Sequence, residues 1–333
     1  MKGLVPNESC VSVESLQGVT IHQKPFPMLF KSVVIWGYPL HSHTHSYIHN
    51  AFFRAFRAMS CPSVQWFPDV ELSEEHIASI PEGSLFITEG NTDKHIPILP
   101  SCYYLLHNCN TEKYTPCKIL VLQVMTNERR NDGIPLDGEW VRFDKTILYM
   151  PWATDLMPDE IQVNIDNLET IQKHQALSRT ICFIGSYNED PWGEVTQFCR
   201  RTGMKFDVSG GFGVLKSSVE GNVMKVQQAR LSPAFQIPWQ IEHGYIPCRI
   251  FKNISYGALG ITNSDTVQDL FKDYADCLVY NPSAEQALDD AINFALPIEK
   301  QKAVMKFVKD HHTYVNRIES IEKAFQLRFA ELA

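Results

Sequence analysis

The stretch GYIPCRIFKNISYGALGITN, residues 244–263, indicates the fold of the region around it. A turn at 244–247 leads into a short amphipathic helix that ends near Gly257 or Gly260, and a small strand follows at 260–262. Proline suits a first helical position, because its fixed φ is helical and its missing N–H is not needed there. A helix that runs into a short strand is typical of an α/β connection.

The start of this helix is a candidate anion site. Its first turn leaves N–H groups without helical partners and carries a partial positive charge. Arg249 and Lys252 are three residues apart on one helical face, so both cations can reach the same point. A diphosphate fits such a helix start. The same residues also fit an ordinary connection with two solvated cations, so local chemistry leaves both interpretations open.

The composition is that of a soluble globular protein without a nucleic-acid partner. The chain has 333 residues, 44% of them hydrophobic and 20% charged, and its net charge is −8. Proteins that bind nucleic acids usually carry a basic face instead. The nine cysteines are scattered, without a Cys-x-x-Cys pair, which is typical of reduced thiols. No apolar run approaches the ~18 residues of a membrane span. We therefore expect a cytoplasmic protein without a membrane span.

Short apolar runs alternate with helical patterns along the chain, which predicts the α/β class with parallel, doubly wound sheets. In the first half we expect strands at 31–37, 64–67, 84–88, 102–107, 119–124 and 147–150, and helices at 46–59 and 73–80. In the second half we expect strands at 180–187, 205–211, 233–237, 260–262 and 277–280. The helices expected there span 192–202, 221–230, 267–274 and 283–296, followed by helical sequence from 298 to the end with a break near 310–313.

A polar, helix-compatible stretch without a strand signal separates the two halves. The predicted parts are a polar tail at 1–28, a Rossmann-like domain at 29–160, a linker at 161–178, a second Rossmann-like domain at 179–300 and C-terminal helices at 301–333. Two α/β domains in tandem leave a cleft between them, and a substrate in that cleft would be contacted from both sides.

Three alternating histidines, His41, His43 and His45, follow the first predicted strand. Ligands of open α/β sheets bind at this end of the strands. Alternating histidines could bind zinc and make the protein a metal-dependent hydrolase. However, His41 lies four residues past Gly37 rather than directly at the strand end, and no later cluster has clear ligand spacing. The hydrolase therefore stays a further alternative.

The second half resembles the C-terminal domain of CgeB-like glycosyltransferases, which have the GT-B fold of two Rossmann-like domains facing a cleft. Four motifs in the family's order, spanning about 180–317, carry this resemblance. They are FIGSYN at 183–188, P-x-R-x-F at 247–251 with Gly257, Gly260 and Thr262, DLF at 269–271 with LVY at 278–280, and HTY-x-x-R at 312–317. The first half matches only in its strand–loop–helix pattern.

The resemblance implies a metal-independent transfer of a sugar from a nucleotide-diphosphate sugar to a hydroxyl acceptor on a glycan, glycoconjugate or protein. It implies no tightly bound cofactor, and a C-terminal helix that packs back toward the first domain. The donor would contact Gly185, Ser186, Gly210, Arg249, Lys252 and Asn253. A general base is needed on the acceptor side, where a histidine has a suitable pKa, and His43 and His45 are the candidates.

One position departs from the family's pattern. The family's helix carries a glutamate after the phenylalanine, which related enzymes use on the donor ribose, and here that position is Lys252. A lysine cannot accept hydrogen bonds from a ribose diol, although it could bind a phosphate or a charged donor group. The alternative to an active enzyme is therefore a GT-B-like protein that has lost catalysis and binds a sugar nucleotide or a glycan.

Overall fold

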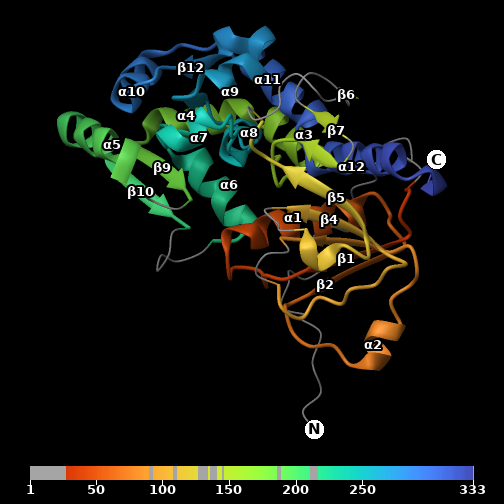
Figure 1. The fold of residues 1–333 in the computed structure, drawn as a ribbon. Helices are drawn as coiled ribbons and strands as arrows, with labels where there is room; N and C mark the ends of the chain where they lie inside the picture. The colour runs from red at the N-terminus through yellow and green to blue at the C-terminus, as the bar shows by residue number, and fades with distance from the viewer. Residues whose placement is uncertain are drawn as a thin grey trace.

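A computed structural model describes residues 28–89, 93–107, 111–126, 134–135, 141–144, 146–185, 189–210 and 217–332. Two α/β halves lie next to each other, one coloured red to yellow and the other green to blue (Figure 1). The predicted α/β class with parallel sheets is confirmed. Among the predicted site residues, Ser186 lies outside the described part of the chain.

The first half is built on an eight-stranded sheet of order β2-β1-β3-β4-β5-β8-β7-β6. Its parallel strands are β1 (Ser32–Trp36), β2 (Ser63–Phe67), β3 (Leu85–Thr88), β4 (Tyr103–His107), β5 (Lys118–Gln123) and β8 (Ile147–Tyr149). Two antiparallel strands that the sequence did not predict extend the edge, β7 (Arg142–Asp144) and β6 (Ile134–Pro135). They are three and two residues long, too short to show an alternating pattern.

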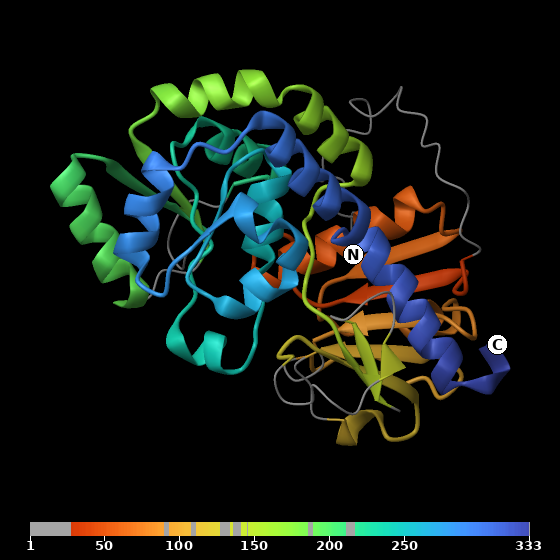
Figure 2. The ribbon, with the colours of Figure 1, turned by 90° about the horizontal axis from the view of Figure 1, so that it is seen from above.

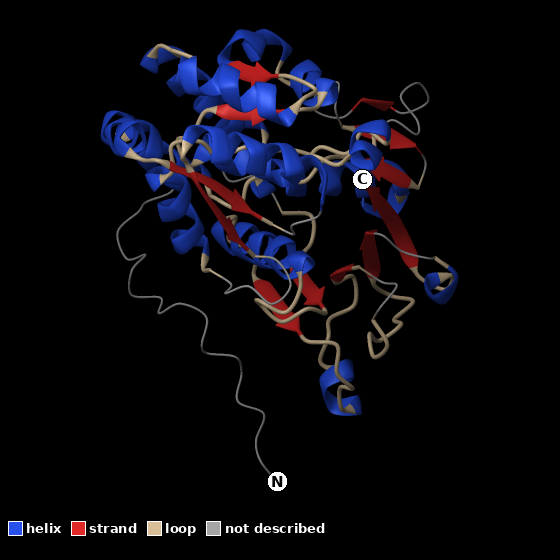
Figure 3. Ribbon diagram, turned by 90° about the vertical axis from the view of Figure 1, so that its left-hand side faces the viewer, coloured by secondary structure: helices blue, strands red, loops and turns tan. Residues whose placement is uncertain are grey.

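Alternate residues of the first-half strands face two different hydrophobic clusters. Val33 and Ile35 of β1 pack under helix α1 (Thr44–Ala58), whereas Val34 and Trp36 face the opposite side. This alternation is the period of two of a β-strand, and it buries β1 on both faces as a parallel strand requires. The short helix α2 (Glu74–Ala78) has no buried residue and stands apart from the rest (Figure 3).

The second half contains two short parallel sheets joined by an extended segment. The sheets pair β9 (Thr180–Ile184) with β10 (Lys205–Ser209), and β11 (Gly260–Thr262) with β12 (Leu278–Tyr280). Between them, Cys182 N donates to Leu231 O at 2.9 Å and Ala234 N donates to Ile261 O at 2.8 Å.

The predicted strand at 233–237 is therefore wrong as a regular strand, although a single parallel bridge joins Leu231 to Ile181. Pro233 has no N–H to donate, so a continuous ladder cannot form there. With residues 231–235 as the middle member, the second half runs in the order β10, β9, segment, β11, β12. This is the 2-1-3-4-5 order of a doubly wound sheet, which β2, β1, β3, β4 and β5 also follow.

The helices of the second half surround these strands. They are α3 (Pro158–Asp166), α4 (Leu168–Leu177), α5 (Glu189–Thr202), α6 (Val219–Gln228), α7 (Pro238–Glu242), α8 (Cys248–Ser255), α9 (Asp265–Leu270), α10 (Ala284–Asn293) and α11 (Ile298–His311). Most of them coincide with predicted helices, and α7 was not predicted. The stretch predicted as a linker forms most of α3 and α4, whose Ile161 and Leu168 are buried with α8. The domain bounds themselves stay a prediction.

The last long helix, α12 (Tyr314–Arg328), crosses from the second half to the first (Figure 2). Thr313 caps it, because its hydroxyl accepts from Asn316 N and the Asn316 side chain reaches back to Thr313 N. Ile318, Ile321 and Phe325 are fully buried in the core of the first half. The expected packing of the C-terminal helix toward the first domain is confirmed.

Candidate functional site

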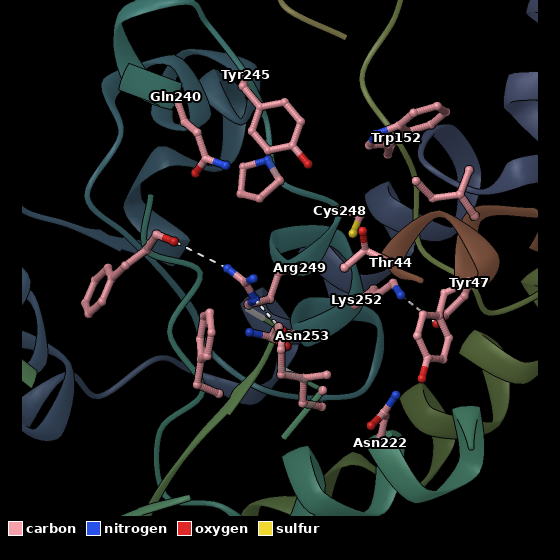
Figure 4. A pocket seen from close by; sticks show the side chains of 18 of the residues that line it. Thr44, Tyr47, Trp152, Asn222, Gln240, Tyr245, Cys248, Arg249, Lys252 and Asn253 are labelled. Carbon is pink, nitrogen blue, oxygen red and sulfur yellow. Dashed lines mark hydrogen bonds and ion pairs between the residues drawn. The ribbon is translucent and has the colours of Figure 1, made fainter. Parts of the chain in front are cut away.

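A cavity of about 330 Å³ lies between the two halves, and most of the predicted site residues line it. The first half contributes the start of α1, and the second half contributes the end of β9 and the helix α8 (Figure 4). The predicted residues on its wall are His45, Gly185, Gly210, Arg249, Lys252 and Asn253. His43 does not line it.

Arg249 lies where the strand order of the second half reverses, between β9 and the segment 231–235. Its Nε donates to Ile184 O at 2.8 Å and its Nη1 to Phe235 O at 3.3 Å, so it links the carboxyl ends of β9 and of the segment 231–235. The guanidinium also lies 3.9 Å from the centre of the Phe183 ring. In doubly wound sheets the ligand crevice is at this switch point.

Burial lowers the pKa of Arg249 to about 10, which still leaves the guanidinium charged at neutral pH. Within the described ranges, no carboxylate forms an ion pair with Arg249. Its two known acceptors are carbonyl oxygens, which are neutral, and an arginine has five N–H donors. Arg249 is therefore a partly desolvated positive charge at the wall of a cavity, as an anion site requires.

Gly185 allows the chain to pass close to this guanidinium, and Gly210 lies next to Gly185. Gly185 has a φ of +150°, and a Cβ there would collide with Arg249 Nη2. Gly210 has a φ of +90°, and its Cβ would lie 3.5 Å from Gly185 N. Both residues have a positive φ, which glycine adopts without strain because it has no Cβ. The two predicted glycine turns and the predicted arginine are thus brought together at the ends of β9 and β10.

Lys252 and Asn253 occupy the next turn of α8 and have other partners. Lys252 Nζ lies 2.8 Å from Asp155 Oδ2, whose side chain is 2% exposed. Burial alone would lower the pKa of Lys252, but the Asp155 carboxylate outweighs burial and raises it. Tyr256 Oη donates to the other carboxylate oxygen at 2.6 Å. Asn253 Nδ2 donates to Ser232 O at 2.6 Å and so ties α8 to the segment 231–235.

The two cations therefore line one cavity but make different contacts, and their joint binding of one anion stays a prediction. Asp155 follows β8 in the first half, so its pair with Lys252 connects the halves. Asp155 was not predicted, because no sequence pattern around it distinguishes it from other acidic residues that follow strands.

The first half contains a histidine–carboxylate pair at the corresponding place in its own sheet. His45 Nδ1 lies 3.3 Å from Glu89 Oε1, with the two side chains 16% and 12% exposed. Glu89 directly follows β3, and its second oxygen accepts from Tyr38 Oη. Tyr38 and the histidine loop follow β1, so the pair lies where the connections after β1 and β3 diverge. A carboxylate beside an imidazole orients it and stabilises its charged form.

His43 and His41 have local roles. His43 is the N-cap of α1, because its Nδ1 accepts from His45 N at 3.3 Å, and its ring stacks on Tyr38 at 4.4 Å. His41 Nδ1 lies 3.1 Å from Tyr47 Oη. His43 and His45 contact each other, with ring centres 4.9 Å apart, and both contact Tyr38, whereas His41 contacts Tyr47. The described residues contain no group of three or more His, Cys, Asp or Glu side chains suited to a metal.

A second histidine pair lies buried behind His45 and was not predicted. The Nε2 atoms of His49 and His107 are 3.1 Å apart, and the rings of His45 and His107 have centres 5.2 Å apart. Burial lowers the pKa of His49 to about 4 and that of His107 well below its usual value. Both imidazoles are therefore neutral at pH 7, and one donates to the other. In the sequence, His49 is one polar residue in a predicted helix, and no motif around it indicates that it pairs with His107.

No protein-family model and no curated protein sequence matches the chain. A solved structure of an α1,3-fucosyltransferase with GDP-fucose is similar to it, with 10% sequence identity and a TM-score of 0.35. The match covers 93% of this chain and 83% of that chain. This TM-score is too low to support a conclusion on its own. The more specific resemblance to CgeB-like enzymes stays a prediction from the motifs. No helix in the described residues combines the length and hydrophobicity that crossing a membrane requires.

Proposed function

We propose that the protein is a glycosyltransferase of the GT-B type, which moves a sugar from a nucleotide-diphosphate sugar to a hydroxyl acceptor in the cytoplasm. One observation carries the proposal: Arg249 and His45, whose imidazole lies beside Glu89, come from opposite halves and line the same cavity. An anion site stabilises a leaving diphosphate and a base can activate an acceptor hydroxyl, and the two switch points hold residues with these chemistries.

The donor diphosphate is assigned to Arg249 and the glycine turns at Gly185 and Gly210. As the bond between the anomeric carbon and the diphosphate oxygen breaks, negative charge grows on that oxygen. A fixed guanidinium in a partly desolvated wall stabilises this charge without reorganising. Because Arg249 is already held by two carbonyl oxygens, its orientation does not have to be established during the reaction.

The acceptor hydroxyl is assigned to His45. Its oxygen forms the new bond to the anomeric carbon, and its proton passes to the imidazole. Glu89 then faces an imidazolium and stabilises it electrostatically. His43 supports this arrangement indirectly, because it caps α1 through His45 N. In this proposal His45 is the catalytic histidine and His43 is a positioning residue.

The ion pair Lys252–Asp155 favours a second candidate, the GT-B-like protein that binds a sugar nucleotide without turnover. An acid at position 252 would belong to the family's donor site, and here a lysine is neutralised by Asp155. Both candidates share the anion site at Arg249. Only turnover separates them.

The experiment measures nucleotide release from UDP-, GDP-, dTDP- and CMP-sugars by the purified protein. We expect release from at least one donor, and a loss of about 10²–10⁴-fold in rate for His45→Gln, as for other general bases. His174→Gln is the matched control, because this exposed histidine lies at the end of α4 away from the cavity. Binding without release from any donor supports the inactive alternative, and neither binding nor release contradicts both.

A further inference from the structure

The turn after β1 contains a tyrosine with an unusual backbone. Tyr38 follows Gly37 and has a φ of +41°, in the left-handed region that glycine adopts readily and a residue with a Cβ does not. Among the described residues other than glycine, His41 and Ser60 share a positive φ. His41 belongs to the same loop, whereas Ser60 lies in the turn after α1. A bulky aromatic residue in this conformation is strained, and such strain is typical of functional sites.

The strained turn places the Tyr38 side chain beside the proposed base. Its Oη donates a hydrogen bond to Glu89 Oε2. Its ring stacks on His43, with centres 4.4 Å apart and planes inclined by 18°. The ring centre of His45 lies 5.8 Å from that of Tyr38, with the two rings edge to face. One residue therefore contacts the N-cap of α1, the proposed base and the carboxylate that pairs with this base.

The contact with Tyr38 holds the Glu89 carboxylate from the side opposite to His45. Glu89 Oε1 lies 3.3 Å from His45 Nδ1, and Oε2 accepts from the tyrosine. Fixing a long, flexible side chain in one orientation costs rotamer entropy, and a second contact on the carboxylate offsets this cost. His43 completes the arrangement, because it stacks on Tyr38 and its Nδ1 accepts from His45 N. The four side chains thus form a closed ring of contacts that includes the His45 imidazole.

We propose that Tyr38 is the positioning residue of the His45–Glu89 pair: its hydroxyl holds the carboxylate toward His45, and the carboxylate holds the imidazole at the cavity. This inference rests on the proposed function. Tyr38 does not line the cavity, so it acts through Glu89 and not on the substrate. Glycine at position 38 would relieve the backbone strain, but it would have no hydroxyl to donate.

The test measures nucleotide release by Tyr38→Phe, which keeps the ring and removes the hydroxyl. We expect kcat to fall about 10–100-fold, the usual effect of losing one hydrogen bond to a charged group. KM for the donor should stay the same, because the proposed donor site at Arg249 lies in the other half. Tyr103→Phe is the matched control and should keep the wild-type kcat, since its hydroxyl donates to Glu331 at 3.4 Å and neither residue lines the cavity.

A double-mutant cycle with Glu89→Ala shows whether the hydroxyl acts through the carboxylate. If it does, Tyr38→Phe lowers kcat in the wild type and has no further effect in Glu89→Ala. The inference is wrong if Tyr38→Phe keeps the wild-type kcat, or if it lowers kcat by the same factor in both backgrounds. Circular dichroism of each variant confirms that folded proteins are compared.

Nitrogen NMR of isotope-labelled protein tests the same contact without any donor. The signal of His45 Nδ1, assigned by comparison with His45→Gln, reports its contact with Glu89. In Tyr38→Phe we expect this signal to move toward its position in Glu89→Ala, and in Tyr103→Phe to stay in place. An unmoved signal in Tyr38→Phe overturns the inference. If the wild type releases no nucleotide from any donor, the transferase is wrong and these spectra decide whether Tyr38 positions His45. Nucleotide release with an unmoved signal rejects only this inference.

Discussion

At the scale of single residues, the Asp155 carboxylate stabilises the positive charge of the Lys252 side chain. Asp155 is 2% exposed and its carboxylate receives both the Lys252 ammonium and the Tyr256 hydroxyl. Burial alone would raise the pKa of Asp155, and these two partners lower it below its usual value. Lys252 thus supplies the positive charge that this buried carboxylate pairs with.

We predict that Lys252→Glu destabilises the protein and does not restore a family-like donor site. The new carboxylate would face Asp155 inside the protein, and breaking a buried ion pair typically costs about 3–5 kcal/mol. Urea denaturation measures the loss. The control is Lys300→Glu, which breaks the exposed pair with Asp276 and should change the stability far less than Lys252→Glu does. Wild-type stability together with higher turnover in Lys252→Glu would reject this account of the position.

Much of the candidate site was predictable at this scale, because each residue follows a strand or begins a helix. Gly185, Arg249 and His45 lie in such positions, and the cavity joins them. Asp155 and its ion pair were not predictable, because the contact joins segments far apart in the chain. The ion pair between Lys252 and Asp155 forms only when the two halves pack against each other.

At the scale of elements, the end of β9 and the start of α8 form one unit around Arg249. The guanidinium occupies the space next to Gly185 where other residues have a Cβ, and its Nε is held by the last carbonyl of β9. The end of β9 therefore fixes the position of the Arg249 guanidinium, which α8 carries.

Gly185→Ala is expected to displace Arg249 and to lower affinity for nucleoside diphosphates, whereas Gly83→Ala is not. Both glycines have a positive φ, so each alanine strains the backbone by about 1–3 kcal/mol. The difference is crowding, since a Cβ at Gly83 meets nothing within 4 Å. Calorimetric titration with UDP and GDP compares the two variants. Equal affinities in both would show that the contact with Gly185 does not position the arginine.

The predicted elements were correct where an apolar run or helical period was long enough to be recognised. They were wrong at 233–237, where the segment is extended and buried but Pro233 interrupts its hydrogen bonds. They missed β6 and β7, which form only as an added edge of the first sheet. These short strands form by pairing onto the edge of the sheet at β8, and the periodicity of a two- or three-residue segment cannot predict that pairing.

At the scale of the whole molecule, the crossing segments join the two halves. Thr154 and Thr313 form a parallel bridge where the chain leaves the first half and where α12 returns to it. Arg317 donates to the carbonyls of Pro151 and Trp152 at 2.8 and 3.1 Å, and to His311 O at 3.1 Å. These hydrogen bonds therefore hold the two halves together at the point where the chain crosses between them.

The buried pair His49–His107 makes global stability depend on pH. The pKa of His49 is about 4 in the folded chain and near 6.5 when unfolded, so the unfolded state binds more protons between these values. The contribution of His49 is complete above pH 6.5 and is lost as pH falls through 4. By linkage, protonation of His49 in the unfolded state should lower the free energy of unfolding by about 2 kcal/mol when the pH falls from 7 to 5.

The measurement compares wild type with His49→Gln by urea denaturation at the two pH values. Glu322 acts in the opposite direction, because burial raises its pKa to about 7, and it is unchanged in both proteins. The difference between the two pH slopes therefore reports the contribution of His49 together with its contact to His107. Equal slopes would mean that His49 is not held neutral by the fold.

The most direct test of the central claim is calorimetric titration of UDP, GDP and dTDP into three proteins: the wild type, Arg249→Ala and Arg201→Ala. Arg201 is the matched control, because it is half exposed and pairs with Glu285 and Asp289 on the surface. If Arg249 binds the donor diphosphate, the wild type and Arg201→Ala bind at least one nucleotide equally. Arg249→Ala then loses at least about 1.4 kcal/mol, or tenfold in Kd. Equal binding by Arg249→Ala, or no binding by the wild type, would contradict the account.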